Sequence, residues 1–213
     1  MQISPRSRSS LGTSINEKSM MKIALFGGTF DPIHHGHLIL AREAVEQLKL
    51  DRLIFVPNTL SPHKLERVTA PADLRMEMVR AAIEGEPQFA ADDLELARTG
   101  PSYAIDTVEE MRGRYPGATL FYLIGEDNVA KLHTWRRADE LQQLARFVVL
   151  SRTGHSPNHS FPVVQRDIDI SSTDLRMRVA KGDSIRYLAP QKVLEIIGQH
   201  QLYKETALLL PKN

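Results

Sequence analysis

Two histidines and the glycine turn before them are the part of the sequence best suited to chemistry. In KIALFGGTFDPIHHGHL, Gly27 and Gly28 follow a short apolar run, and His34 and His37 stand three residues apart. Glycines allow a sharp turn and a close approach of the backbone to a ligand. If a helix begins here, the two imidazoles lie one turn apart on one face, where they can contact adjacent phosphates. They can donate hydrogen bonds to phosphate oxygens and, when protonated, offset negative charge.

The glycine turn does not match the common phosphate-binding motifs. It lacks the Gly-Lys-Ser/Thr of a Walker loop, and its glycines are wrongly spaced for a dinucleotide-binding fingerprint. A helix that starts after the turn still presents free N–H groups to an anion. Taken alone, the histidines could also be helix-terminal residues without a ligand, or metal ligands. The neighbouring glycines favour the phosphate interpretation.

A second candidate anion site is the segment ISSTDLR near the C-terminal end. Ser171 and Asp174 fit a capping box. The N–H groups and hydroxyls of Ser172 and Thr173 would then lie at a helix N-terminus, where an anion binds. Arg176 would project from the first turns and can bind two phosphate oxygens. Taken by itself, the segment fits a capped surface helix with a solvated arginine better than an anion site.

Segments with strand-like and helix-like apolar spacing alternate along the chain and would position these groups. The expected strands are 22–26, 52–58, 89–96, 118–125 and 146–151. The expected helices are marked by Leu38, Ala41, Val45 and Leu48, by Leu74, Met78, Ala81 and Ala82, by Ile105, Val108 and Met111 after Ser102 as N-cap, and by segments 174–182 and 190–203.

This alternation predicts an α/β fold: a Rossmann-like, doubly wound parallel sheet with helices on both faces and two closing C-terminal helices. Ligands bind beyond the carboxyl ends of the strands in such folds, and the glycine turn lies at one such end. We expect residues 21–213 to form a single domain. The Ser-rich, basic residues 1–20 read as a disordered N-terminal extension, with a targeting segment as the alternative.

Composition limits the classes of partner. The 213 residues carry a net charge of +1, which argues against broad electrostatic binding of nucleic acid or of an anionic membrane. No window approaches the ~18 apolar residues of a membrane span. The chain has no cysteine, so neither disulfides nor zinc thiolate sites can form. A cytoplasmic protein with a small anionic ligand, and with no nucleic-acid or membrane partner, fits best.

The motif GGTFDPIHHGH resembles the signature of the nucleotidylyltransferase superfamily. There, a Gly-Thr-Phe-Asp turn precedes a His-x-Gly-His element that binds ATP phosphates, and a second element like ISSTDLR lies near the C-terminus. The segments SPHK, RTGPSYAIDT and IGEDNVAKLHTW extend the likeness. From about Met21 to Tyr203 the chain resembles a bacterial nicotinate-mononucleotide adenylyltransferase.

The resemblance implies site residues. His34, His37 and Arg176 would be catalytic. ATP would be bound by Gly27, Gly28, Thr29, Phe30, His34, His37, Gly125, Asp127, Ser172, Thr173 and Arg176. Nicotinate mononucleotide would be bound by His63, Lys64, Ser102, Tyr103, Ala104, Trp135 and Arg136.

Within this set, the resemblance implies that Trp135 stacks on the pyridine ring and that backbone N–H groups around positions 104 and 136 meet the ring carboxylate. A lone tryptophan is otherwise more often a packing residue. Asp127 would meet ribose hydroxyls, with a helix cap as the alternative. Ala104 stands where many relatives carry threonine, and Arg136 is at a variable position. These departures leave the preference for nicotinate over nicotinamide mononucleotide open.

The implied reaction transfers AMP from ATP to nicotinate mononucleotide, giving nicotinate adenine dinucleotide and pyrophosphate in NAD biosynthesis. Mg²⁺ would enter with ATP, because no dense carboxylate cluster suggests a metal site in the protein. A pantetheine-phosphate adenylyltransferase and a nucleotide-binding regulator without turnover are the alternatives. The apolar tail at 207–210 could dock on this chain or on a second subunit of a homo-oligomer, and it could equally be disordered.

Overall fold

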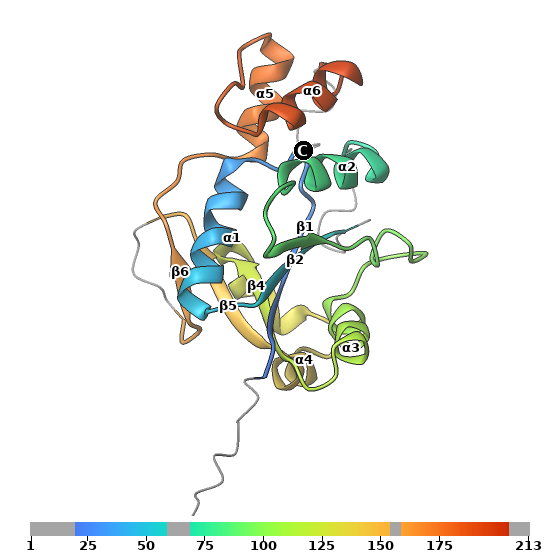
Figure 1. The fold of residues 1–213 in the computed structure, drawn as a ribbon, viewed down its shortest axis with the longest axis vertical. Coiled ribbons are helices and arrows are strands. Elements are labelled where there is room, and N and C mark those ends of the chain that lie inside the picture. The colour runs from blue at the N-terminus through green and yellow to red at the C-terminus, as the bar shows by residue number, and fades with distance from the viewer. Residues whose placement is uncertain (1–19, 59–68, 154–158, 205–213) are drawn as a thin grey trace, which may run out of the picture.

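The computed structural model describes residues 20–58, 69–153 and 159–204. Within them, an all-parallel sheet of six strands runs in the order β3-β2-β1-β4-β5-β6. The strands are β1 Lys22–Gly28, β2 Arg52–Pro57, β3 Phe89–Ala91, β4 Thr119–Gly125, β5 Arg146–Ser151 and β6 Val163–Gln165. The chain starts in the middle of the sheet and winds outward in both directions, which confirms the predicted Rossmann-like, doubly wound fold (Figure 1).

The helices connect and cover these strands. They are α1 His35–Leu48, α2 Ala72–Ala82, α3 Ala104–Arg114, η1 Glu126–Thr134 (a 3₁₀ helix), α4 Ala138–Leu144, α5 Ser172–Lys181 and α6 Gln191–Gln199. The first strand, helix and following strand lie where the apolar spacing predicts them.

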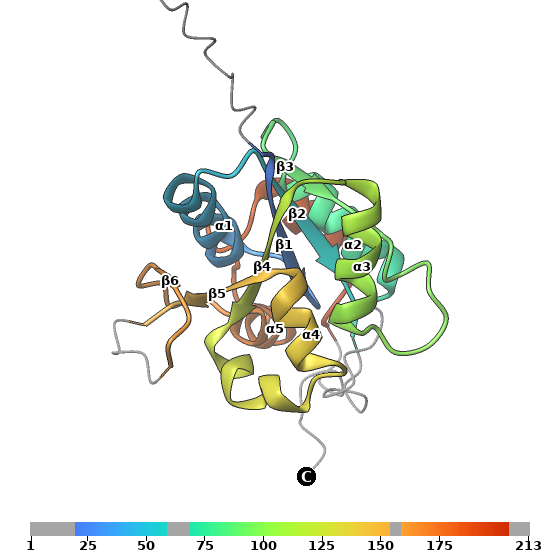
Figure 2. The same cartoon turned by 90° about the horizontal axis from the view of Figure 1, so that it is seen from below.

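The strands contribute side chains to two hydrophobic cores, one on each face of the sheet, because successive side chains point to opposite faces. In β1, Ala24 and Phe26 belong to one cluster and Ile23 and Leu25 to the other. Apolar residues of α1, α2, α5 and α6 complete the first cluster, and those of α3, η1 and α4 complete the second. Figure 2 shows α1 and α3 on opposite sides of the sheet.

Of the two C-terminal helices, α6 packs against α2, and neither extends the sheet (Figure 1). Ser171 is the N-cap of α5, and its hydroxyl accepts the N–H of Asp174 at 3.1 Å, as the capping-box pattern predicts. The helix ends at Gly182, whose φ of 79° is left-handed. Glycine adopts this conformation without a steric penalty.

The structure differs from the sequence prediction at several elements. The strand expected at 89–96 is paired only over Phe89–Ala91, and α6 ends at Gln199. Three further elements, η1, α4 and β6, are present that the apolar spacing does not predict. The N-cap of α3 is Tyr103 instead of Ser102.

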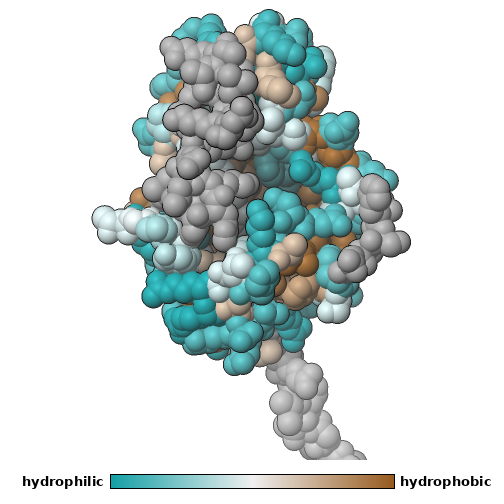
Figure 3. All heavy atoms as spheres, turned by 180° about the vertical axis from the view of Figure 1, so that it is seen from behind, coloured by the Kyte–Doolittle hydropathy of each residue, from teal (hydrophilic) through white to brown (hydrophobic). Residues whose placement is uncertain are grey.

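The surface opposite to the view of Figure 1 combines many hydrophilic residues with small apolar patches (Figure 3). In the described part of the chain, no helix has both the length and the apolarity needed to cross a membrane.

Candidate active site

Two adjoining pockets open at the carboxyl ends of β1 and β4. They share the glycine turn of residues 27–29 on one side and Gly125, Asp127 and Asn128 on the other. β1 and β4 are neighbours at the point where the chain changes direction across the sheet, which is where ligands bind in such folds. We call the pocket of about 270 Å³ that contains His34 and His37 the histidine pocket, and the pocket of about 210 Å³ that contains Trp135 the tryptophan pocket.

The two histidines of the first pocket are in direct contact. His34 is the extended N-cap residue of α1, and its backbone N–H donates to Nδ1 of His37 at 3.3 Å. The two rings stack with their centroids 3.8 Å apart. Because Nδ1 of His37 accepts a hydrogen bond, its ring proton is on Nε2. That leaves an Nε2–H donor for a ligand.

Both rings favour the neutral form in the folded protein. Phe26 and Phe30 enclose the His37 ring at centroid distances of 6.1 and 5.2 Å. Burial lowers the pKa of His37 well below its usual value, and burial together with the charge of Arg152 lowers the pKa of His34 from 6.5 to about 3. The sequence left two ways for these imidazoles to bind phosphate: as neutral hydrogen-bond donors or as protonated cations. The lowered pKa values favour neutral donors in the free protein.

The space around the histidines explains the glycines of the motif. A Cβ on Gly36 would lie 3.0 Å from the His34 ring, and one on Gly28 would lie 2.8 Å from the Phe30 ring. Phe30 itself is buried, with a left-handed φ of 48°. Although it lines the histidine pocket, as expected of an ATP-binding residue, its ring also packs against Phe26.

The turn after β1 is fixed by side chains from the C-terminal part of the chain. Arg176 donates from Nη1 to the carbonyl of Asp31 at 2.6 Å and from Nη2 to Oγ1 of Thr173 at 3.1 Å. Ser172 donates its hydroxyl proton to the carbonyl of Pro32 at 2.9 Å. The Asp31–Pro32 peptide bond is cis. These contacts join the two motifs that the sequence places 140 residues apart.

Arg176 differs from the expectation of a projecting, exposed side chain. It lines the histidine pocket but is only 3% exposed, and two of its nitrogens already donate hydrogen bonds within the protein. Its buried Nε has no hydrogen-bond partner among the described residues. A phosphate bound by both Nη atoms would share them with Asp31 and Thr173, through the second N–H that each Nη carries.

A buried arginine that the sequence analysis did not single out completes this framework. Arg75 of α2 donates to the carbonyl of Thr29 at 2.7 Å and to that of Ala70 at 3.1 Å. Burial lowers its pKa, while the neighbouring Asp31 opposes that shift. An isolated arginine in an amphipathic helix gives no sequence signal that it is buried.

Two helix N-termini face the histidine pocket. Gly36 and His37 in the first turn of α1, and Ser172 and Thr173 in the first turn of α5, line its wall. The first N–H groups of a helix lack intrahelical acceptors and carry a partial positive charge. The arrangement is therefore suited to a polyanion such as a triphosphate.

Arg152 is a pocket residue that the sequence analysis missed. It follows β5, lines the histidine pocket and donates to the carbonyl of Ile170 at 2.8 Å. Its charge contributes to the lowered pKa of His34 and of His37, which places it within electrostatic reach of both. Its position just beyond the carboxyl end of a parallel strand is the signal that could have identified it.

In the tryptophan pocket, Trp135 combines packing with a ligand-facing position. Its ring makes edge contacts with Tyr122 and Phe147 at centroid distances of 6.1 and 6.3 Å, and it also lines the pocket. The structure thus supports both interpretations of this residue. An aromatic ring held on one side by other rings offers a rigid surface for a flat ligand.

Ser102, Tyr103 and Ala104 line the same pocket. Ala104 is the first residue of α3, so its N–H is one of those for which the helix offers no acceptor. The guanidinium of Arg136 lies 4.9 Å from the centre of the Tyr103 ring and 3.9 Å from the carboxylate of Asp106. A helix N-terminus and an arginine therefore flank the position expected for the ring carboxylate.

The predicted residues and the residues that line the two pockets do not coincide completely. His63 and Lys64 lie outside the described residues. Further lining residues that were not predicted are Asn58, Glu95, Tyr122, Asn128, Lys131 and Thr134. In the described ranges, no group of three His, Cys, Asp or Glu side chains is arranged to hold a metal ion.

Comparison with known proteins agrees with this geometry. Residues 25–178 match the model of the family described as "Cytidylyltransferase-like". A protein of Bacillus pumilus (strain SAFR-032) named "Probable nicotinate-nucleotide adenylyltransferase" is 42% identical over 188 residues, which cover 87% of this chain and 100% of that protein. A protein of Oceanobacillus iheyensis with the same name is 43% identical, with 86% and 97% covered.

A solved structure has the same fold at lower sequence identity. The Plasmodium falciparum nicotinic acid mononucleotide adenylyltransferase complexed with NaAD superposes with a TM-score of 0.72 at 18% identity, covering 86% of this chain and 97% of that one. The fold, the two motifs and the sequence identities lead to the same assignment. The chain belongs to the cytidylyltransferase-like family and, within it, to the nicotinate-nucleotide adenylyltransferases.

Proposed function

We propose that this chain transfers AMP from ATP to nicotinate mononucleotide, forming nicotinate adenine dinucleotide and pyrophosphate for NAD biosynthesis. The observation that carries the proposal is the junction of the two pockets at Gly27, Gly28 and Thr29. One pocket suits a polyphosphate and the other suits a flat ring with an acid group. Their common edge is where the phosphate of one substrate can meet the α-phosphorus of the other.

In the histidine pocket, neutral imidazoles and helix N–H groups would hold the ATP phosphates. The Nε2–H of His37 is a preorganised donor, because Nδ1 is already bonded to the backbone of His34. Arg152 adds positive charge beside both rings. Donors fixed before the reaction stabilise developing charge without reorganisation.

In the tryptophan pocket, Trp135 would support the pyridine ring. The N–H of Ala104 and the guanidinium of Arg136 would meet its carboxylate. An uncharged carboxamide would gain less from a helix N-terminus and an arginine than a carboxylate would. This difference favours nicotinate over nicotinamide mononucleotide.

The chemical step would be an in-line displacement. A phosphate oxygen of nicotinate mononucleotide attacks the α-phosphorus, the new P–O bond forms, and the bond to the bridging oxygen breaks, with its electron pair leaving on pyrophosphate. The attacking phosphate is already ionised at neutral pH, so no general base is needed. Catalysis then consists of positioning and charge stabilisation.

ATP would enter as its magnesium complex, in which the ion neutralises part of the phosphate charge. Asp127 is exposed toward both pockets and is the carboxylate suited to the ribose or to the ion's water shell. The expected cytoplasmic location, the possibility of a homo-oligomer and the expected absence of nucleic-acid partners are separate proposals, to be checked by cell fractionation, light scattering and gel-shift measurements.

The test is pyrophosphate release from Mg·ATP with nicotinate mononucleotide, nicotinamide mononucleotide or phosphopantetheine supplied separately, together with chromatographic identification of the dinucleotide. We expect fast release only with nicotinate mononucleotide. Release mainly with phosphopantetheine would make the chain a pantetheine-phosphate adenylyltransferase. ATP binding without release in any mixture would indicate a nucleotide-binding regulator.

A further inference from the structure

Glu95 is a buried carboxylate on the wall of the tryptophan pocket, and the reaction described above gives it no role. It is 4% exposed and lies in the segment between β3 and α3. Placing an acid next to the binding position of another acid is costly unless its charge is taken up by hydrogen bonds. Its partners therefore indicate what it does.

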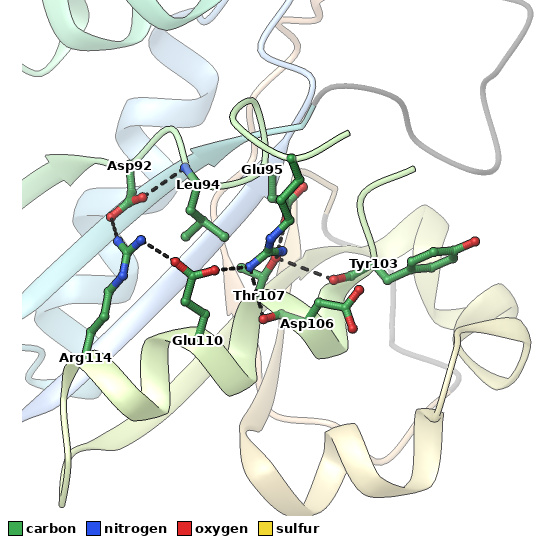
Figure 4. A network of polar contacts seen from close by, with 9 residues as sticks. Asp92, Leu94, Glu95, Tyr103, Asp106, Thr107, Glu110 and Arg114 are labelled. Atoms are coloured by element: carbon green, nitrogen blue, oxygen red, sulfur yellow. Dashed lines mark hydrogen bonds and ion pairs between the residues drawn. The ribbon is translucent and has the colours of Figure 1, made fainter. Parts of the chain in front are cut away.

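Those partners lie before and after Tyr103 and Ala104, the segment proposed to bind the ligand. The hydroxyl of Thr107 donates to Oε1 of Glu95 at 2.6 Å (Figure 4). The side chain of Ser102 also lies next to this carboxylate: burial raises the pKa of Glu95, and Thr107 and Ser102 both oppose that shift. Ser102 precedes Tyr103 and Ala104, and Thr107 follows them in the first turn of α3. One carboxylate thus holds the chain before and after the N-terminus of this helix.

This anchoring replaces an ordinary helix cap. The N-cap residue of α3 is Tyr103, which makes no side-chain cap hydrogen bond. The N-terminal N–H groups are therefore left available for a ligand, and their direction depends on how the first turn is held. Thr107 is completely buried, so its bond to Glu95 fixes that turn from inside the protein.

Charged residues closer to the surface also contact Thr107. Arg98 donates to Oγ1 of Thr107 at 3.1 Å and to the carbonyl of Asp106 at 3.2 Å, and it pairs with Glu110. Figure 4 shows the network continuing to Arg114. Among the described residues of this network, Glu95 lines the tryptophan pocket, whereas Arg98 and Glu110 do not.

We propose that Glu95 is a positioning residue of the acceptor site: its carboxylate holds Ser102 and Thr107, and through them aims the N-terminus of α3 at the acid group of the pyridine ring. This inference rests on the proposed function. It predicts that loss of the carboxylate misplaces the N–H groups that bind the mononucleotide. The ATP phosphates bind at α1 and α5, so their binding is independent of Glu95.

The test compares the KM values of both substrates in Glu95→Ala, Glu95→Gln and the unsubstituted enzyme. We expect Glu95→Ala to raise the KM for nicotinate mononucleotide about tenfold or more, because the buried hydrogen bond from Thr107 and the contact with Ser102 are lost at the helix start. The KM for ATP should stay within about twofold. Glu95→Gln should recover most of the loss, since its carbonyl oxygen still accepts from Thr107.

Glu110→Ala is the matched control, because it removes a carboxylate from the same network that does not line the pocket. Its two KM values should stay within about twofold of those of the unsubstituted enzyme. An equal rise in the Glu110 variant, or an equal rise for both substrates in Glu95→Ala, would overturn the proposal by showing a general structural role. So would an unchanged KM for the mononucleotide.

If Glu95→Ala does not fold, Thr107→Val answers the same question, because it keeps the buried volume and removes the donor. A selective rise of the KM for the mononucleotide supports the proposal, and no rise overturns it. The measurements distinguish failure of the proposed function from failure of the role assigned to Glu95. Failure of the unsubstituted enzyme to form the dinucleotide contradicts the proposed function, whereas normal turnover without a selective KM effect contradicts only the role of Glu95.

Discussion

The hydroxyl of Tyr203 donates a 2.7 Å hydrogen bond to Oδ1 of Asp31, although 172 positions separate the two residues. Both are nearly fully buried. The same carboxylate oxygen accepts the N–H of Ala70 at 3.1 Å. The last described turn of the chain is therefore attached to the turn that follows β1 and leads to the histidines. Stability and activity should both depend on this contact.

We expect Tyr203→Phe to lower the free energy of unfolding by about 1–3 kcal/mol, the usual effect of removing a buried hydrogen bond to a charged group. Turnover should fall as well, because Asp31 belongs to the active-site turn. Urea denaturation and steady-state kinetics would measure the two effects. Tyr187→Phe is the control, since Tyr187 is 78% exposed. Equal effects in both variants would contradict the assigned role.

The neutral histidines should make stability depend on pH. The pKa of His34 is lowered by burial from 6.5 to about 3, so below pH 6.5 the unfolded chain takes up a proton that the folded chain does not. The stabilisation is thus complete above pH 6.5 and is lost as the pH falls from 6.5 toward 3. For one such group the slope approaches about 1.4 kcal/mol per pH unit.

Accordingly, the free energy of unfolding of His34→Gln should fall less steeply than that of the unsubstituted protein between about pH 7 and pH 4. Urea denaturation at several pH values measures this difference. His200→Gln, which changes an exposed histidine, should leave the slope unaltered. Parallel curves for the protein and its His34 variant would show that the ring is not held neutral by folding.

His37→Ala should lower kcat by about 10²- to 10³-fold, the common cost of removing one preorganised donor to a transition state. Circular dichroism should show the same secondary structure as in the unsubstituted protein. His35→Ala is a matched control in the same motif, because His35 is not among the described residues that line the histidine pocket. Near-normal turnover of the His37 variant would refute its role.

Arg152→Ala should reduce kcat/KM for ATP by about tenfold or more, since a charged donor beside the phosphates is lost. Arg146→Ala changes the arginine at the other end of β5, which is exposed and distant from the pocket. It should behave like the unsubstituted enzyme. Equal losses would mean that the effect of the Arg152 change comes from general surface charge.

The central strands could be predicted because each is a continuous apolar run between turn-forming residues. β6 was missed because only Val163–Gln165 pairs, and three residues do not establish a period. α4 was missed for a similar reason: it presents Leu141 as its buried residue, so its helical spacing is weak. Short elements of this kind form because of tertiary contacts.

Site residues that belong to a recognisable motif could be predicted from the sequence. Residues whose role depends on how deeply they are buried were harder to predict. Ser102 has the side chain of an N-cap, but in the structure it lies next to Glu95, and Tyr103 takes the N-cap position. The sequence likewise cannot show that Arg75 is 1% exposed, because charged residues are usually solvated. The burial of Arg75 depends on a segment distant in sequence, the turn at Thr29, whose carbonyl accepts its hydrogen bond.

The division of the two substrates between the two pockets is the central claim, and the KM values of Trp135→Ala test it most directly. Trp135 lines the tryptophan pocket and is not among the described residues that line the histidine pocket. We expect the KM for nicotinate mononucleotide to rise about tenfold or more, from the loss of aromatic contact area, while the KM for ATP stays within about twofold. An equal rise for both substrates would contradict the account and would show that Trp135 serves only to pack the protein.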